Sequence, residues 1–193
     1  MKRGSIRGAA FALAGMASAA ALVVAYFAIV GVSARAQPGA VETFLSRRVR
    51  NLAIARHAFG AQRPVPSTEA SLAEGRAHFA DHCASCHAND GSGNAEMGRG
   101  LSPRAPDMRL PATQNLSDAQ LFYIIENGVR FTGMPAWSTG TPAGEEASWH
   151  LVHFIRHLPQ ITPAEIDQME AMNPRSPEEI RQDIAAEEFL NGK

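Results

Sequence analysis

The longest apolar feature of the chain is a run of 26 uncharged residues, 9–34, near its N-terminus. As a helix this run would be about 39 Å long, which is enough to cross the hydrocarbon core of a bilayer. The apolar core of a secretory signal is shorter, about 7 to 15 residues. We therefore interpret residues 1–36 as a transmembrane anchor, although Ala34-Arg35-Ala36 also fits an A-x-A cleavage site. The basic residues before the run predict a cytoplasmic N-terminus and an exported remainder: Lys2, Arg3 and Arg7.

Residues 41–59 show a less regular apolar pattern that still predicts a helix. Its apolar positions are Phe44, Leu45, Val49, Leu52 and Ile54, and its arginines are Arg47, Arg48, Arg50 and Arg56. Such a helix would either lie on anionic lipid near the anchor or pack against the protein or a partner. Pro64 and Pro66 then predict a stiff hinge. Residues 37–66 are thus expected to form a juxtamembrane segment.

From residue 67 to residue 160 the apolar spacing and the capping residues predict an all-helical domain. A first helix begins at Thr68 or Ser71 and runs into Cys83. Helical patterns follow at two further places: residues 118–127, between Ser117 and Gly128, and residues 145–158, before Pro159. No alternating or β-branched run near Cys83 indicates a strand.

Residues 161–193 form an acidic tail with two more helix starts. Each start places a cap, a proline and a glutamate in order: Thr162-Pro163-Ala164-Glu165 and Ser176-Pro177-Glu178-Glu179. The final helix carries a sparse apolar face, which suggests a clasp on the domain or on a partner.

The net charge of −1 hides a strong asymmetry along the chain. Residues 1–66 hold nine Lys or Arg and one acidic residue (+8). Residues 67–159 hold six basic and ten acidic residues (−4), and residues 160–193 hold three basic and eight acidic residues (−5). An acidic domain of this kind is either an ordinary solvated surface or one steered toward a basic face on its partner.

One motif indicates a specific chemistry: Cys83-Ala84-Ser85-Cys86-His87. The spacing is typical of c-type haem attachment, in which both thiols form thioethers and the histidine ligates the iron. The chain has only two cysteines, so no disulfide competes for either. A zinc site would need two further ligands at finger-like spacing, yet the next histidine is His150. A thioredoxin-like dithiol would need a strand–helix–strand pattern nearby.

Among the seven methionines, Met134 is the best candidate for a sixth iron ligand. Pro135 favours an extended backbone at Met134, and Gly133 permits an unusual turn before it. The alternative is that Met134 only fills a gap in the core. Met97 and Met108 are rival ligands. Ligation by histidine and methionine would close the iron to other ligands and suit single-electron transfer.

The residues from Gly75-Arg76-Ala77-His78-Phe79 through Cys83–His87 to Gly133-Met134-Pro135 resemble bacterial class I cytochrome c. The similarity covers about residues 67–159. It implies a small helical haem domain whose first and last helices cross near Gly75 and Phe79. It also implies that these residues meet Trp149 or Phe154.

The same resemblance implies two details of the site. Trp137 is expected near a haem propionate, and either Pro103 or Pro106 supplies the backbone carbonyl behind His87. The candidate partners of the propionates are Arg99, Arg104, Arg109 and Arg130. By their spacing, two further histidine groups could share a helix face and bind a metal, but without a Cys or carboxylate to complete either set we expect surface residues: His78 with His82, and His150 with His153 and His157.

Together these features predict a membrane-anchored monohaem cytochrome that cycles one covalent haem c between Fe(II) and Fe(III). We expect one inner-membrane span with the haem domain on the periplasmic side, and redox proteins rather than nucleic acid as partners. No acid, base or nucleophile forms a substrate site, so we expect a carrier and not an enzyme. Two alternatives stay open: the electron-delivering subunit of a larger membrane oxidoreductase, and a haem-based gas sensor with an open iron position.

Overall fold

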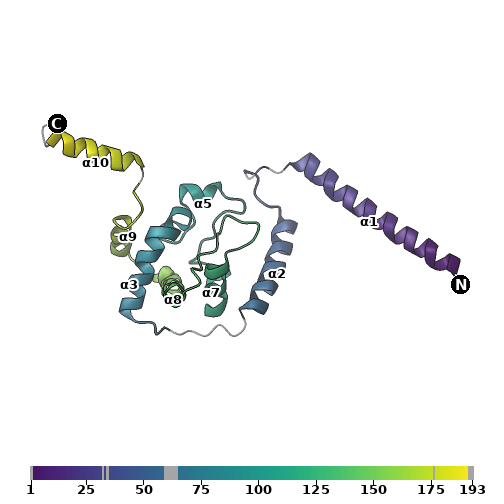
Figure 1. Cartoon of the computed structure of the whole chain (residues 1–193), viewed down its shortest axis with the longest axis horizontal. Helices are drawn as coiled ribbons and strands as arrows, with labels where there is room; N and C mark the ends of the chain where they lie inside the picture. The colour runs from purple at the N-terminus through teal and green to yellow at the C-terminus, as the bar shows by residue number, and fades with distance from the viewer. Residues whose placement is uncertain (1, 32, 34, 59–64, 176, 191–193) are drawn as a thin grey trace. The chain divides into compact units, whose positions relative to one another are not determined.

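The computed structural model describes residues 2–31, 33, 35–58, 65–175 and 177–190. By its internal contacts the chain divides into two compact units, residues 1–36 and residues 37–193. Figure 1 draws the helices of both units.

The first unit is one long helix, α1 (Lys2–Val30). Within it, the 21 residues Ala10–Val30 are long and apolar enough to cross a membrane, and all of them are exposed in the structure. A helix of this length rises about 31 Å, which is close to the thickness of a bilayer core. The length and composition fit either a membrane anchor or a signal sequence. Ala34 lies outside the described residues, so the cleavage site stays a prediction.

The second unit is helical, and no strand occurs among its described residues. Its elements are α2 (Ala40–His57), α3 (Glu69–His78), the π-helical turn η1 (Phe79–Cys83), α4 (Ala84–His87), α5 (Glu96–Gly100), α6 (Pro111–Gln114), α7 (Asp118–Asn127), α8 (Pro142–His157), the 3-10 turn η2 (Leu158–Gln160), α9 (Pro163–Glu170) and α10 (Pro177–Leu190). The predicted all-α class is confirmed.

Side-chain caps set several of these helix starts, as the sequence predicts. Ser117 caps α7 by accepting from the Gln120 backbone N–H (3.2 Å). Thr162 caps α9 in the same way, by accepting from the Glu165 backbone N–H (3.3 Å). Such exchanges satisfy backbone donors that the first helical turn leaves unpaired. The first domain helix starts at Thr68 and not at Ser71, because the Ser71 N–H donates to the Thr68 hydroxyl (3.1 Å).

Some predicted helix bounds differ from the structure. The helix predicted over residues 41–59 ends at His57, while Phe59, Pro64 and Ser176 lie outside the described residues. The last domain helix begins a turn earlier than predicted, at Pro142, because Thr141 caps it and proline fits the first helical position. The short helices α5 and α6 had no capping signal and were not predicted.

The centre of the second unit is the crossing of α3 with α8. In Figure 1, α8 is seen nearly end-on between α3 and α7. Gly75 of α3 lies against the backbone of α8, where a Cβ would come 2.1 Å from the His150 carbonyl oxygen. One turn further, the fully buried rings of Phe79 and Phe154 pack with centroids 5.2 Å apart. The predicted crossing is therefore confirmed, with Phe154 as the contact residue.

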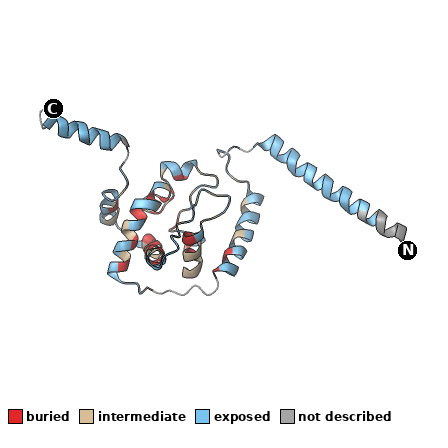
Figure 2. Ribbon diagram, in the orientation of Figure 1, coloured by how far each residue is buried: buried red, intermediate tan, exposed pale blue. Residues whose placement is uncertain are grey.

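Two further contacts extend the core from α8. Trp149 stacks on Phe122 of α7, with ring centroids 4.4 Å apart. The Arg156 side chain donates to Asp118 (2.8 Å) and to the Gln114 carbonyl (2.7 Å), which ties the end of α8 to α6 and α7. Figure 2 shows buried segments in red on each of α3, α7 and α8. These contacts hold α7 in a fixed position on α8.

The tail contributes to the core through α9 and not through α10. Met169 of α9 is fully buried. Glu165 accepts from His157 (2.8 Å) and lies 3.5 Å from the Arg76 guanidinium, which joins α9 to α8 and α3. The side chains of α10 from Glu178 onward are exposed, so α9 and not α10 clasps the domain, and a clasp of α10 on a partner stays a prediction.

The histidines of α8 are also less exposed than predicted. His153 is buried, and its Nε2 lies 3.1 Å from the Val65 carbonyl oxygen. The expectation of a surface residue is wrong at this position, because α8 is apolar on more than one side and turns His153 toward the segment before α3.

Gly75→Ala should destabilise the second unit by about 3 kcal/mol, because the new methyl group would meet backbone atoms that cannot move aside. The free energy of unfolding in denaturant, followed by tryptophan fluorescence, measures the change. Gly100→Ala is the matched control, since nothing lies within 4 Å of its Cβ position. Equal stabilities of the two variants would contradict the close crossing.

Candidate functional site

The Cys83–His87 motif begins at the last residue of a π-helical turn. Helix α3 continues through η1 into α4, so the motif follows directly from the helix that crosses α8. Three residues apart on a helix, Cys83 and Cys86 share one side of it. Ala88 follows with a φ of 59°, which ends the helical path. The two thiols are thus held next to one another by the core crossing.

The two thiols differ in their surroundings. Cys83 packs against the hydrophobic core. Burial, with a smaller contribution from Cys86, raises the pKa of the Cys83 thiol to about 12. Neither cysteine forms a disulfide. At neutral pH Cys83 is therefore a protonated thiol, which argues against a reactive dithiol pair at this motif.

His87 is buried, with 7% of its surface exposed. Burial lowers the pKa of its imidazole, while the Pro106 backbone carbonyl acts in the opposite direction. His87 Nδ1 has no partner within hydrogen-bond geometry in the described part of the chain, so the carbonyl lies close to the ring but outside that geometry. The imidazole is thus neutral, as a metal ligand must be. Of the two candidate carbonyls behind His87, the structure places that of Pro106 there.

The long segment from Asn89 to Arg109 folds back onto the motif. The Gly93 N–H donates to the His87 carbonyl (2.8 Å), and the Met108 N–H donates to the Gly91 carbonyl (2.8 Å). Gly98 of α5 approaches so closely that a Cβ would come 1.9 Å from the Cys86 carbonyl oxygen. These contacts fix the backbone on both sides of His87. The close approach at Gly98 had no local sequence signal.

One of the arginines considered for the propionates already has acidic partners. Arg109 lies 2.8 Å from a carboxylate oxygen of Asp107 and 3.0 Å from one of Asp90. The hydrogen bond from Arg109 lowers the pKa of Asp107. The Arg99 guanidinium donates to the Asn94 carbonyl. Arg104 and Arg130 are exposed and stay candidates.

Met134 lies on a loop that the C-terminal end of α7 holds in place. The Met134 N–H donates to the Thr132 hydroxyl (3.1 Å), and its carbonyl accepts from the Val129 N–H (3.1 Å). Gly128, with a φ of +65°, lies so close that a Cβ would come 2.6 Å from the Pro135 carbonyl carbon. The sequence marks Gly128 only as a helix stop, but its second role is to admit this loop.

Trp137 is distant from the motif in the sequence but contacts the residue that precedes it. Its backbone N–H donates to the Ile125 carbonyl (3.0 Å), and its side chain packs against the core. The Trp137 ring meets the ring of His82 edge-on, with centroids 5.2 Å apart. Since His82 immediately precedes Cys83, the structure brings Trp137 to the cysteine segment. No signal in the sequence indicated this contact of His82.

A metal site built from side chains alone is not seen in the part of the chain that the structure describes. No group of three or more His, Cys, Asp or Glu side chains that could hold an ion occurs there. His78 and His82 stack with ring centroids 5.7 Å apart and form a pair only.

The residues present fit a covalently attached haem. Two neighbouring thiols precede a buried, neutral imidazole that has an unpaired Nδ1 and a carbonyl behind it. This donor set matches c-type attachment followed by iron ligation through Nε2. Residues 70–155 match the family model described as Cytochrome C oxidase, cbb3-type, subunit III. The chain contains a c-type cytochrome domain. No match to the chain was found among curated proteins.

Membership of this class confirms the predicted cofactor and the general function. The cytochrome carries covalent haem c and transfers electrons to and from redox partner proteins. The matched residues include the whole Cys83–His87 motif and Met134, Trp137 and the α3–α8 crossing. Zinc binding and dithiol chemistry, the other interpretations of the motif, are not supported.

Gly128→Ala should displace the loop that carries Met134 and cost about 3 kcal/mol of stability, since it adds a clash to a left-handed backbone. Gly140→Ala provides a matched control: its φ is +68°, but nothing lies within 4 Å of its Cβ position. The control should cost about 1 kcal/mol, from backbone conformation alone. Denaturant unfolding of both variants measures the difference, and equal losses would contradict the close approach at Gly128.

Proposed function

We propose that this cytochrome is a membrane-anchored, extracytoplasmic electron carrier with one haem held by Cys83 and Cys86. His87 and Met134 would ligate the iron, and Trp137 would lie near a propionate. The bound haem supplies a one-electron Fe(II)/Fe(III) couple with a potential raised by the methionine ligand.

The observation that carries this proposal is the state of His87. A buried imidazole with an unpaired Nδ1 costs stability unless the ring gains another interaction. Ligation of iron through Nε2 would leave the proton on Nδ1, where the nearby Pro106 carbonyl is available to accept its hydrogen bond. The carbonyl would then orient the ring and make it a stronger ligand.

The position of Met134 supports its choice over the other methionines. Met108 is 8% exposed and belongs to the hydrophobic core, where it packs against other apolar residues. Met97 is 59% exposed. Met134 is half-buried on a loop fixed at both its N–H and its carbonyl. A fixed loop can hold a thioether at one place without a cost in ordering it.

The topology of the proposal rests on the apolar helix and the basic residues before it. With residues 10–30 in the membrane, the positive N-terminus stays in the cytoplasm and the haem domain is exported. The domain and the tail carry net charges of −4 and −5, which favour a partner with a basic docking face. We propose that the cytochrome acts as an electron carrier without a substrate site of its own.

A second candidate is supported by the family match. The matched model describes a subunit of an oxidase. The cytochrome would then deliver electrons within a larger membrane oxidoreductase, using the same haem site. Co-purification of the anchored chain with other subunits favours this candidate over a freely diffusing carrier.

The direct test of the haem assignment is the mass and the spectrum of the purified full chain. The mass should exceed that of the polypeptide by one haem, and Cys83→Ser with Cys86→Ser should remove the covalent haem because no thioether can form. A denatured chain without attached haem would contradict the proposal. Carbon monoxide binding to the reduced wild-type protein would contradict the closed iron and favour the gas sensor.

Met134→Ala should abolish the sulfur-to-iron absorption feature at the red end of the oxidised spectrum and lower the reduction potential, because the iron loses its thioether ligand. Two controls bracket the change. Met97→Ala should leave the spectrum and stability unchanged, while Met108→Ala should cost about 3 kcal/mol of stability and keep the feature. Loss of the feature in Met108→Ala but not in Met134→Ala would identify Met108 as the ligand.

A further inference from the structure

Helix α2 has two different sides. Thr43, Arg50 and Ile54 are its less exposed residues, and Ile54 is only 6% exposed. Their spacing of seven and four residues places them in one row. His57, at the end of the helix, stacks on Tyr123 of α7 with ring centroids 5.9 Å apart. This inward row packs α2 against the haem domain.

The opposite side of α2 carries a row of exposed apolar residues, which we call the outward stripe. The stripe consists of Val41, Leu45, Val49 and Leu52, which are 72%, 56%, 68% and 67% exposed. At about 100° per residue, its centre lies about 160° around the helix from the inward row. The haem domain therefore cannot cover it. The apolar pattern seen in the sequence thus divides between two sides, with Ile54 inward.

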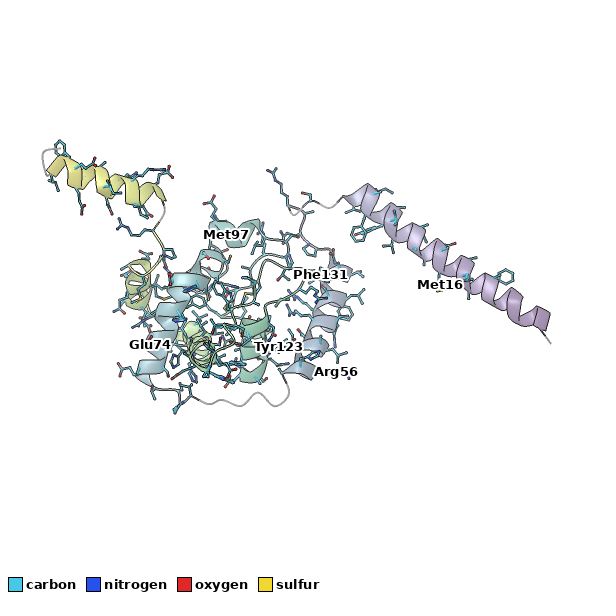
Figure 3. The ribbon with its side chains drawn as sticks, in the orientation of Figure 1. Met16, Arg56, Glu74, Met97, Tyr123 and Phe131 are labelled. Atoms are coloured by element: carbon cyan, nitrogen blue, oxygen red, sulfur yellow. The ribbon has the colours of Figure 1, made fainter. Side chains whose placement is uncertain are left out.

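Basic residues flank the stripe. By helical position Arg48 lies beside it and Arg56 lies in line with it, one turn past Leu52; both are exposed. The Arg48 guanidinium also lies over the ring of Phe44, 5.2 Å from its centroid. Figure 3 shows Arg56 at the C-terminal end of α2. Glu42 is the one acidic residue in the helix, so α2 has a net charge of +3. Apolar residues between arginines are the pattern of a helix that lies at a membrane surface.

We propose that the outward stripe of α2 lies on anionic lipid and holds the haem domain at the membrane surface. The inference rests on the proposed membrane anchor. Nine residues separate Val30 from Ala40, so α2 begins within about 35 Å of the end of α1, even if the connection is fully extended. An anchored chain therefore keeps the stripe within reach of the bilayer. Acidic headgroups complement Arg48 and Arg56, while the acyl boundary accepts the valines and leucines.

This placement has a consequence for the haem site. Helix α2 packs on α7 through His57 and Tyr123, and the C-terminal end of α7 holds the loop of Met134. A stripe bound to lipid therefore orients the haem domain relative to the bilayer. The surfaces through which electrons pass would be presented at a fixed height to membrane-bound partners.

The test uses the full haem-loaded chain in vesicles of neutral lipid or of neutral lipid with one third anionic lipid. A single spin label is placed on Val49→Cys in the stripe or on Asn51→Cys, an exposed control on the same helix. Both native cysteines are bound to haem, so each variant takes one label. Spectra of the reduced protein report label access to oxygen, which partitions into lipid, and to a water-soluble nickel complex.

The Val49 label should become several-fold more accessible to oxygen than to nickel in anionic vesicles, and the Asn51 label should not. Arg48→Gln with Arg56→Gln should weaken the protection of the Val49 label from nickel, and with it lipid binding, about tenfold or more. Each arginine near an anionic surface contributes to that binding. Protection that needs a second copy, seen as spin–spin broadening, would overturn the proposal. So would protection by the acidic helix α10, recognised because it persists without anionic lipid and is lost on deleting residues 177–190.

Failure of the proposed function would be recognised separately. More than one label per chain would show that Cys83 or Cys86 is free and would contradict haem attachment. Labels on free native thiols would add the same signal to the Val49→Cys and Asn51→Cys samples, so they would not create a difference between the two. A purified chain with the mass expected for residues 37–193 plus one haem would show cleavage before Gln37 and contradict the anchor. Equal access of both labels in an anchored, singly labelled chain overturns the lipid contact alone.

Discussion

The approach of α3 to α8 depends on the absence of a side chain at Gly75. Backbone meets backbone there, since the position of a Cβ lies 2.1 Å from the His150 carbonyl oxygen. Any larger residue would separate the helices and pull apart the buried rings of Phe79 and Phe154. Phe79 is also the first residue of the π-helical turn that ends at Cys83. The position of the first haem cysteine therefore follows from one glycine two turns earlier.

Helix α8 also determines the position of α7 and of the loop that carries Met134. Trp149 of α8 stacks on Phe122 and fixes α7. At its end Gly128 admits the segment that holds Met134. The cysteine motif and the methionine loop are far apart in sequence, but both are located by α8. A haem domain of this size has a small apolar core, and packing on the one helix α8 explains how it can still keep the cysteine motif and the loop of the proposed ligand Met134 in fixed positions.

Local signals in the sequence predicted the parts of the fold that depend on neighbours along the chain. The caps at Ser117 and Thr162 and the stop at Gly128 were visible because hydrogen bonds within one turn decide them. The cysteine motif was visible because covalent attachment demands its spacing. The contact of Gly98 with Cys86, the choice of Pro106 and the burial of His153 depend on residues distant in sequence. They required the structure, as did the division of α2 into two sides.

The packing of α9 has a practical meaning for how this domain is delimited. The family match ends at residue 155, yet Leu158 and Met169 are fully buried and lie beyond it. Glu165 bonds back to His157 and faces Arg76 across the domain boundary suggested by the match. A fragment cut at residue 155 would leave an apolar hollow open to water beside α3 and α8. The hydrophobic core of the cytochrome domain thus extends through α9, and a fragment meant to keep that core closed has to include this helix.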